Sequence, residues 1–206
     1  EDAGAQTVPN FATGFDPGAP EESAQTAAHY GVTVTGTTGT LAFSAAPAVA
    51  PDGTLYVMDL GRGTLSSVLS NGTVTRLMGA GSDRVIRTTM DPKTFDLPLF
   101  TISRDTYTNS PQLGIDPAGN PYLGILREDT TKDNGVDVTK RFLYLFRLEN
   151  KATTMTLHWD GSAVALAGRT SLPSFDALSI DKDRNIFFSM DGQVSRLTPS
   201  LQYTAL

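Results

Sequence analysis

Apolar and polar residues alternate in short runs over most of the chain, and residues typical of turns separate the runs. Alternation with a period of two is typical of β-strands. The segment 46–59 predicts a short strand, a turn and a second strand. The segment 65–77 predicts a hairpin about Asn71-Gly72, because both central residues of a type I′ turn need positive φ. Together the two segments predict a meander of four antiparallel strands.

The first half of this unit recurs twice along the chain. Residues 113–124 and 178–189 repeat its strand, turn and strand. The matched turn positions are Gly53, Gly119 and Arg184, which are spaced by 66 and 65 residues. A four-stranded sheet of this size cannot bury both faces alone, so repeated sheets must stack on one another. The repeat therefore predicts a β-propeller-like arrangement.

We predict an all-β fold of repeated four-stranded antiparallel meanders, β-propeller-like and either small, irregular or partial. The β domain is expected to span residues 32–206, with successive units at 46–78, 111–167 and 175–204. Residues 1–31 are expected to form an extended acidic arm, because proline, glycine and acidic residues stand there without periodicity.

Further predictions concern single segments. The Thr- and Val-rich residues 32–43 predict a strand, and a further strand is expected at 97–103. Residues 85–95 and 128–140 are predicted to be loops, since a spacing near 65 residues exceeds the roughly 40–45 residues of a propeller blade. The predicted core consists of apolar residues on the inward faces of the strands. These are Val49, Leu55, Val57, Val68, Leu77, Leu113, Ile115, Tyr122, Phe142, Tyr144, Phe146, Leu178, Ile180, Phe187 and Val194.

Composition excludes several classes of function. The formal net charge is −6, and residues 1–50 hold five acidic and no basic residues. The rest of the chain is nearly neutral, with 16 basic and 17 acidic residues. Neither part can neutralise a long nucleic acid or form a polybasic membrane patch, so we expect no nucleic-acid partner and no membrane insertion. The chain has no cysteine and two histidines, which excludes thiolate sites and a three-histidine zinc site within one chain.

The repeated segments resemble a known group of propellers. Residues 47–59, followed by 71–79, resemble an NHL repeat and the related gluconolactonase and streptogramin-lyase propellers. Residues 113–124 and 178–189 match the first half of the same pattern, and the resemblance covers about half of the chain. It implies a β-propeller, which in these families normally closes six blades. The lyase resemblance would imply a catalytic histidine with a divalent metal, but that pattern has no matching position here.

Two histidines are candidates for chemistry. His158 stands beside Trp159 at a hairpin, where it would serve either as a general base or ligand next to an aromatic surface, or as a packing residue. His29 lies in the acidic arm. Residues Asn71-Gly-Thr73 have the form of a glycosylation sequon, but the type I′ turn alone explains them.

Acidic residues offer candidate ion sites. Asp181, Asp183 and Asn185 have the spacing that begins many calcium loops, but Ile186 occupies the position where such a loop has glycine. An ordinary Asp-containing turn is the alternative. The acidic segment 128–137 is either an ion site or a solvated insertion. Carboxylates that a channel metal site might use are Asp59, Asp105, Asp129 and Asp176.

The sequence lacks a recognisable nucleophile or metal constellation, so we predict a protein that is not an enzyme and assign no catalytic, cofactor or metal residues, with calcium as a possible ion. Scarce lysine and abundant threonine favour an extracellular or cell-surface location. The predicted function is an interaction or self-assembly module, which binds a protein partner or itself as an oligomer or filament. The arm and strand 32–43 would lie along a sheet edge of the same or another subunit. The alternative is a metal-dependent lactone hydrolase or lyase.

Overall fold

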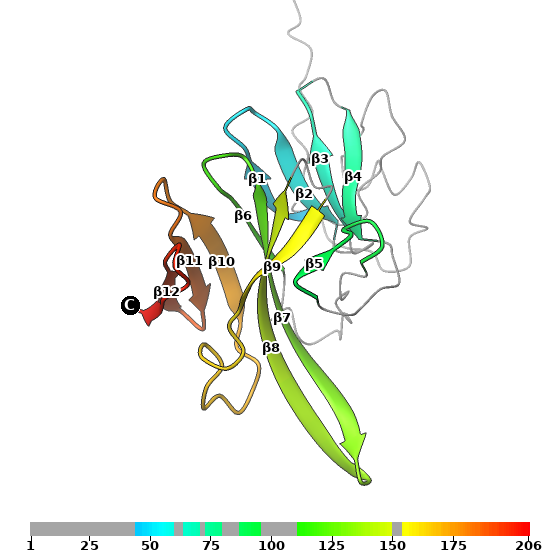
Figure 1. The fold of residues 1–206 in the computed structure, drawn as a ribbon, viewed down its shortest axis with the longest axis vertical. Helices are drawn as coiled ribbons and strands as arrows, with labels where there is room; N and C mark the ends of the chain where they lie inside the picture. Colours follow the sequence, from blue (N-terminus) through cyan, green and yellow to red (C-terminus); the bar gives the residue numbers. More distant parts are fainter. Residues whose placement is uncertain (1–43, 60–63, 71–72, 80–86, 96–110, 150–153) are drawn as a thin grey trace, which may run out of the picture.

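The computed structural model describes residues 44–59, 64–70, 73–79, 87–95, 111–149 and 154–206. These residues form three antiparallel sheets and contain no helix (Figure 1). None of the described segments is therefore a helix long and apolar enough to cross a membrane. The predicted all-β fold of antiparallel meanders is confirmed. The predicted arm 1–31 and the strands 32–43 and 97–103 lie outside the described residues.

Each sheet is a meander of consecutive strands, apart from one added edge strand. The first sheet has the order β1-β2-β3-β4, formed by β1 (Ser44–Val49), β2 (Leu55–Asp59), β3 (Thr64–Val68) and β4 (Val74–Gly79). The middle sheet has the order β5-β9-β8-β7-β6, formed by β5 (Thr89–Met90), β6 (Gln112–Ile115), β7 (Pro121–Asp133), β8 (Val136–Glu149) and β9 (Thr154–Asp160). The third sheet has the order β10-β11-β12-β13, formed by β10 (Phe175–Ile180), β11 (Ile186–Met190), β12 (Gln193–Leu197) and β13 (Tyr203–Ala205).

The turn between the first two strands of each meander has the same geometry in all three sheets. Gly53, Gly119 and Arg184 have φ angles of 84°, 86° and 64°. In each turn the N–H of this residue donates to the carbonyl oxygen three positions earlier, at 2.9–3.0 Å. The predicted equivalence of the three positions is confirmed. Arg184 shows that the turn imposes the left-handed conformation even where the residue is not glycine.

The three sheets stack around their first strands. β6 packs between β1 and β10, the first strands of the neighbouring sheets. One apolar core fills the space between the first and middle sheets, and a second core fills the space between the middle and third sheets. Both faces of the middle sheet are thus covered by neighbouring sheets, as propeller blades are.

Most of the predicted core is buried or half-buried, and two residues are not. Val49 and Val194 are 65% and 44% exposed. In β12 the buried positions are Ser195 and Leu197, and strict alternation then turns Val194 to solvent. Ala50, the residue after Val49, is buried, so the Val49 side chain at the adjacent position faces solvent. The prediction failed for these two residues because it used side-chain hydrophobicity alone. It did not ask which alternate positions of each strand face the core.

The segment 128–140, predicted to be a loop, is a long hairpin instead. β7 and β8 pair without a register shift from Tyr122↔Arg147 to Asp133↔Val136. Their turn is Asn134-Gly135, with φ angles of 49° and 82°, as a type I′ turn requires. The outer part of this hairpin is mostly exposed and extends away from the three sheets (Figure 1). Its polar residues form cross-strand pairs, so they lack the apolar alternation by which a strand is recognised.

The predicted loop 85–95 also contains a strand. Residues Thr89 and Met90 pair with Met155 and Thr156 and add β5 to the outer edge of the middle sheet. Only two residues take part, so no periodic pattern marks them. Phe95, which follows, is 1% exposed and belongs to the first core.

Candidate functional site

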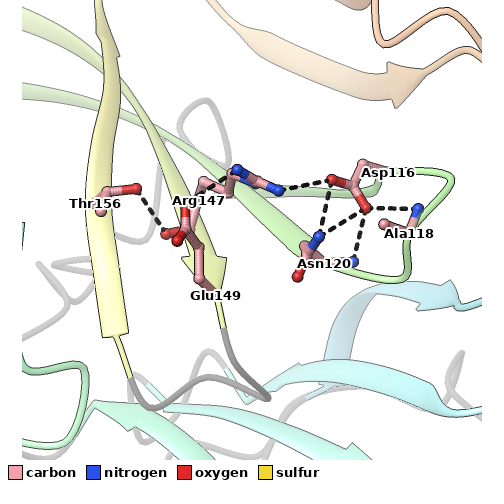
Figure 2. A network of polar contacts seen from close by, with 6 residues as sticks. All are labelled: Asp116, Ala118, Asn120, Arg147, Glu149 and Thr156. Atoms are coloured by element: carbon pink, nitrogen blue, oxygen red, sulfur yellow. Dashed lines mark hydrogen bonds and ion pairs between the residues drawn. The ribbon is translucent and has the colours of Figure 1, made fainter.

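A buried carboxylate organises the turn between β6 and β7. The side chain of Asp116 is fully shielded from solvent. Its Oδ1 accepts hydrogen bonds from the main-chain N–H groups of Ala118, at 2.9 Å, and Asn120, at 2.8 Å. The side-chain amide of Asn120 lies 3.1 and 3.0 Å from the two carboxylate oxygens (Figure 2). These donors fix the carboxylate in one orientation.

Arg147 of β8 connects this turn to Glu149 on the same strand and to Thr156 of β9. Its Nη2 lies 3.4 Å from Oδ2 of Asp116, and its Nη1 donates to Oε1 of Glu149 at 3.0 Å (Figure 2). The Thr156 hydroxyl of β9 donates to the main-chain carbonyl of Arg147 at 3.4 Å. Arg147 lies opposite Tyr122 in the β-ladder, and its guanidinium carbon is 5.8 Å from that ring's centroid. One arginine therefore holds two carboxylates and one aromatic ring together.

A β-bulge places His158 against the same tyrosine. Leu145 pairs with Trp159 and Phe146 pairs with Leu157, so His158 is an additional residue between two ladder pairs. Bulges of this kind redirect a side chain from the regular alternation. The imidazole of His158 lies edge-on to Tyr122, with ring centroids 5.0 Å apart and planes at 83°.

Burial and charge favour the neutral form of the imidazole. Burial lowers the pKa of His158, and the positive charge of Arg147 lowers it further, while Glu149 acts in the opposite direction. Burial raises the pKa of Tyr122, so its phenol keeps its proton. The cluster thus combines a neutral base, a phenol, a guanidinium and carboxylates. Such a set can accept a proton at the imidazole and stabilise negative charge at Arg147.

The lowered pKa of His158 predicts a pH dependence of stability. In the unfolded chain this histidine has its ordinary pKa near 6.5. Below that pH the unfolded state binds a proton at His158 more readily than the folded state does. The free energy of unfolding is therefore expected to fall as the pH drops from 7 through about 6.5. His158→Gln should remove this component, and His29→Gln should not. Denaturant unfolding at a series of pH values measures it, and an unchanged pH slope in His158→Gln would contradict the assignment.

The structure separates His158 from its sequence neighbour. Trp159 is buried and stacks on Tyr203, with centroids 5.8 Å apart, and it also contacts Phe188 in the second core. His158 lies instead with Tyr122 of β7, far away in sequence. The aromatic neighbour of His158 is therefore Tyr122, and not Trp159 as the sequence had suggested.

The acidic candidates do not join this cluster. Oδ1 of Asp181 accepts hydrogen bonds from the main-chain N–H groups of Asp183, at 2.9 Å, and Asn185, at 2.8 Å, as the turn interpretation requires. Asp176 is exposed and accepts a hydrogen bond from the Ser174 hydroxyl at 3.1 Å. In the acidic segment 128–137, Glu128 pairs with Arg141 and Lys132 pairs with Asp137. His29, Asn71, Asp105 and the side chains of Asp59 and Asp129 lie outside the described residues.

Sequence reasoning missed the residues that build the cluster. These residues are Asp116, Asn120, Tyr122, Arg147 and Glu149. Asp116 and Asn120 repeat the turn positions of Asp181 and Asn185, and this repeat was the one signal available. Arg147 and Glu149 are brought to the turn by the pairing of β7 with β8, which no local motif encodes.

The described residues do not fit a divalent metal. Among them, no three histidine or carboxylate side chains come together in a way that could hold one. The Asp116 oxygens already accept hydrogen bonds from N–H donors and face the positive charge of Arg147. We therefore assign no metal ligand and route no chemical step through a metal.

Comparison with known proteins finds similarity in structure alone. No protein-family model and no curated protein matches the sequence. Similar solved structures include virginiamycin B lyase from Staphylococcus aureus, at 12% identity and a TM-score of 0.36, covering 79% of this chain and 55% of that one. A gluconolactonase from Xanthomonas campestris has 13% identity and a TM-score of 0.39, covering 79% and 61%. Regucalcin from Agrobacterium tumefaciens, a calcium-binding protein, has 14% identity and a TM-score of 0.27, covering 79% and 72%.

These findings confirm one prediction and correct another. The predicted resemblance to lyase-type and gluconolactonase-type propellers is confirmed. The chain spans less than two thirds of the length of that lyase and that gluconolactonase. The prediction that the protein is not an enzyme is withdrawn, because the similar structures include a lyase and a gluconolactonase and none of the findings supports a non-enzymatic role.

Proposed function

We propose that the chain carries the proton-transferring site of a propeller-type lactone hydrolase or lyase, with His158 as its base. The observation that supports this proposal is a neutral, half-buried imidazole placed on a bulge beside Arg147, Glu149 and Tyr122. A general base acts best when it is unprotonated at the working pH, and the lowered pKa of His158 provides this. The substrate class follows the sequence resemblance stated above.

Both reactions begin with transfer of a proton to the His158 imidazole, from water in one case and from carbon in the other. In hydrolysis, the imidazole takes a proton from water as the oxygen attacks the lactone carbonyl, the ring C–O bond then breaks, and the imidazolium returns the proton to the leaving oxygen. In elimination, the imidazole takes a proton from the carbon adjacent to the one that bears the ring oxygen, and the alkyl C–O bond breaks as a carbon–carbon double bond forms, which releases a carboxylate. Negative charge develops on oxygen in either route, and a guanidinium stabilises such charge. Asp116 and Glu149 hold Arg147 in place, so they are positioning residues.

The proposal predicts that His158→Gln lowers kcat for lactone ring opening by about 100-fold or more, because general base catalysis contributes roughly that factor. The measurement uses the full chain and a panel of lactones, with ring opening followed by acid release or by absorbance of the unsaturated product. Lys182→Gln is the control, because this side chain is 86% exposed and takes no part in the cluster, and it should retain the parent rate. A full rate in His158→Gln, or no reaction with any lactone in the panel, would refute the proposal.

A second variant separates a chemical role from a structural one. Glu149 raises the pKa of His158, so Glu149→Gln should move the acidic limb of the pH–rate profile to lower pH. A merely structural histidine would give no such shift. The extracellular location inferred from composition stays a prediction.

A further inference from the structure

The outer part of the β7–β8 hairpin has two edges along which no strand of the described residues pairs. β7 pairs with β6 only as far as Gly124, and β8 pairs with β9 only from Tyr144 onward. Beyond these residues, no other described strand accompanies the hairpin (Figure 1). An unpaired edge presents main-chain N–H and C=O groups that can bind another strand.

The contacts at Leu143 show which main-chain groups face outward on β8. Its carbonyl accepts the N–H of Gly161 at 2.9 Å, and its N–H donates to Oγ of Ser162 at 3.1 Å. Main-chain groups alternate between the two sides of a strand. The N–H and C=O groups of Thr139 and Arg141 therefore point to the same side as those of Leu143, away from β7. Nothing in the described residues continues the pairing past Leu143.

This edge of β8 is complementary to itself. In an antiparallel pairing of two copies with Thr139 opposite Thr139, Asp137 of each copy lies opposite Arg141 of the other. We propose that two copies of this chain associate through the β8 edges in this register. Thr139 is then a hydrogen-bonded pair across the two-fold axis, because its main-chain groups face outward. The proposal is independent of the enzymatic function.

The charges of the hairpin support this register. Within one copy, Glu128 contacts Arg141 at 2.7 Å, and Lys132 lies 3.7 Å from Asp137. The two-fold axis joins these pairs into rows across four strands. Each row runs Glu128, Arg141, Asp137 of the second copy and Lys132 of the second copy, so negative and positive charges alternate. Between two such rows lies a row of threonines, where Thr130 and Thr139 are already bonded at 3.0 Å.

Apolar contacts select the β8 edge over the β7 edge. The β7 edge also places Glu128 opposite Lys132 if two copies meet at Thr130. The β8 edge, however, additionally places Val136 opposite Phe142 of the second copy. Val136 is 66% exposed, and pairing with an aromatic ring would cover it. The β7 edge offers no such apolar pair.

The test measures the mass of the full chain over a range of concentrations by sedimentation equilibrium. The mass of two chains is expected at high concentration. Thr139→Pro removes the outward N–H on the β8 edge and should weaken association about tenfold or more, since two symmetric hydrogen bonds are lost. Thr130→Pro is the matched control, because Thr130 lies directly opposite Thr139 and its outward N–H faces the other edge. It should associate like the parent chain.

A charge exchange tests the register. The double variant Glu128→Lys, Arg141→Glu keeps an opposite-charge pair inside each hairpin. It places the new carboxylate at position 141 opposite Asp137 of the second copy, so association should weaken about tenfold. Circular dichroism checks that all variants fold. The mass of one chain at every concentration, unchanged association in Thr139→Pro, or loss of association in Thr130→Pro alone would overturn the proposal.

Discussion

Gly124→Ala is expected to lower the free energy of unfolding by about 2–4 kcal/mol, because it forces a methyl group into a filled core. Gly124 lies in β7 under the ring of Phe175. An added Cβ would lie 2.6 Å from Cζ of Phe175, even closer to its Cε1, and 3.3 Å from Cδ2 of Leu145. Phe175 is 2% exposed, so its ring has no room to move away. The contact joins the middle sheet to the third sheet, and its loss would weaken their packing.

The neighbouring strand offers a matched control. At Gly114 in β6, an added Cβ would meet Leu178 at 3.3 Å and Ile180 at 3.4 Å, which small shifts of aliphatic side chains can relieve. Gly114→Ala should therefore cost clearly less than Gly124→Ala in denaturant unfolding. Adding Phe175→Leu to Gly124→Ala should restore part of the lost stability by shortening the opposing side chain. Equal losses for the two glycine variants, or no recovery in the double variant, would contradict this account of the packing.

The parts of the fold that were predictable from sequence are those that local chemistry determines. Gly53, Gly119 and Arg184 mark turns because the surrounding residues set the hydrogen bonds within a few positions. The strands around these turns alternate because one face of each is buried. Stacking of the resulting sheets follows, since no single sheet can cover its own apolar faces. The propeller-like arrangement was therefore accessible without any long-range information.

The parts that failed depend on pairing between distant segments. The outer β7–β8 hairpin has few apolar residues, and its stabilising pairs, such as Glu128 with Arg141, are visible only once the register is known. The bulge at His158 is a property of the β8–β9 ladder and leaves no trace in the composition. The cluster of Tyr122, Arg147 and His158 draws one residue from each of three strands. A search for local motifs cannot find such a cluster, so the non-enzyme prediction was made without it.

The buried carboxylate of Asp116 supports both the fold and the candidate site. Asp116→Ala is expected to lower the free energy of unfolding by about 3–5 kcal/mol, since it leaves Arg147 without its buried partner and several N–H groups without an acceptor. The donors that lose their acceptor are the main-chain N–H groups of Ala118 and Asn120 and the Asn120 amide. The same loss frees Arg147 to turn toward Glu149 alone, so lactone ring opening should also fall.

Asp181 provides the control, because it makes the same turn contacts in the third sheet. Its carboxylate also accepts the main-chain N–H two and four residues later and the side-chain amide of Asn185. It is partly exposed, so water can replace the lost carboxylate acceptor, and it has no partner equivalent to Arg147 among the described contacts. Asp181→Ala should therefore destabilise the protein much less than Asp116→Ala in urea unfolding, and should leave ring opening unchanged. Comparable losses in the two variants would show that the turn itself, and not the Asp116–Arg147 pair, carries the stability, because burial and the arginine are what distinguish the two sites.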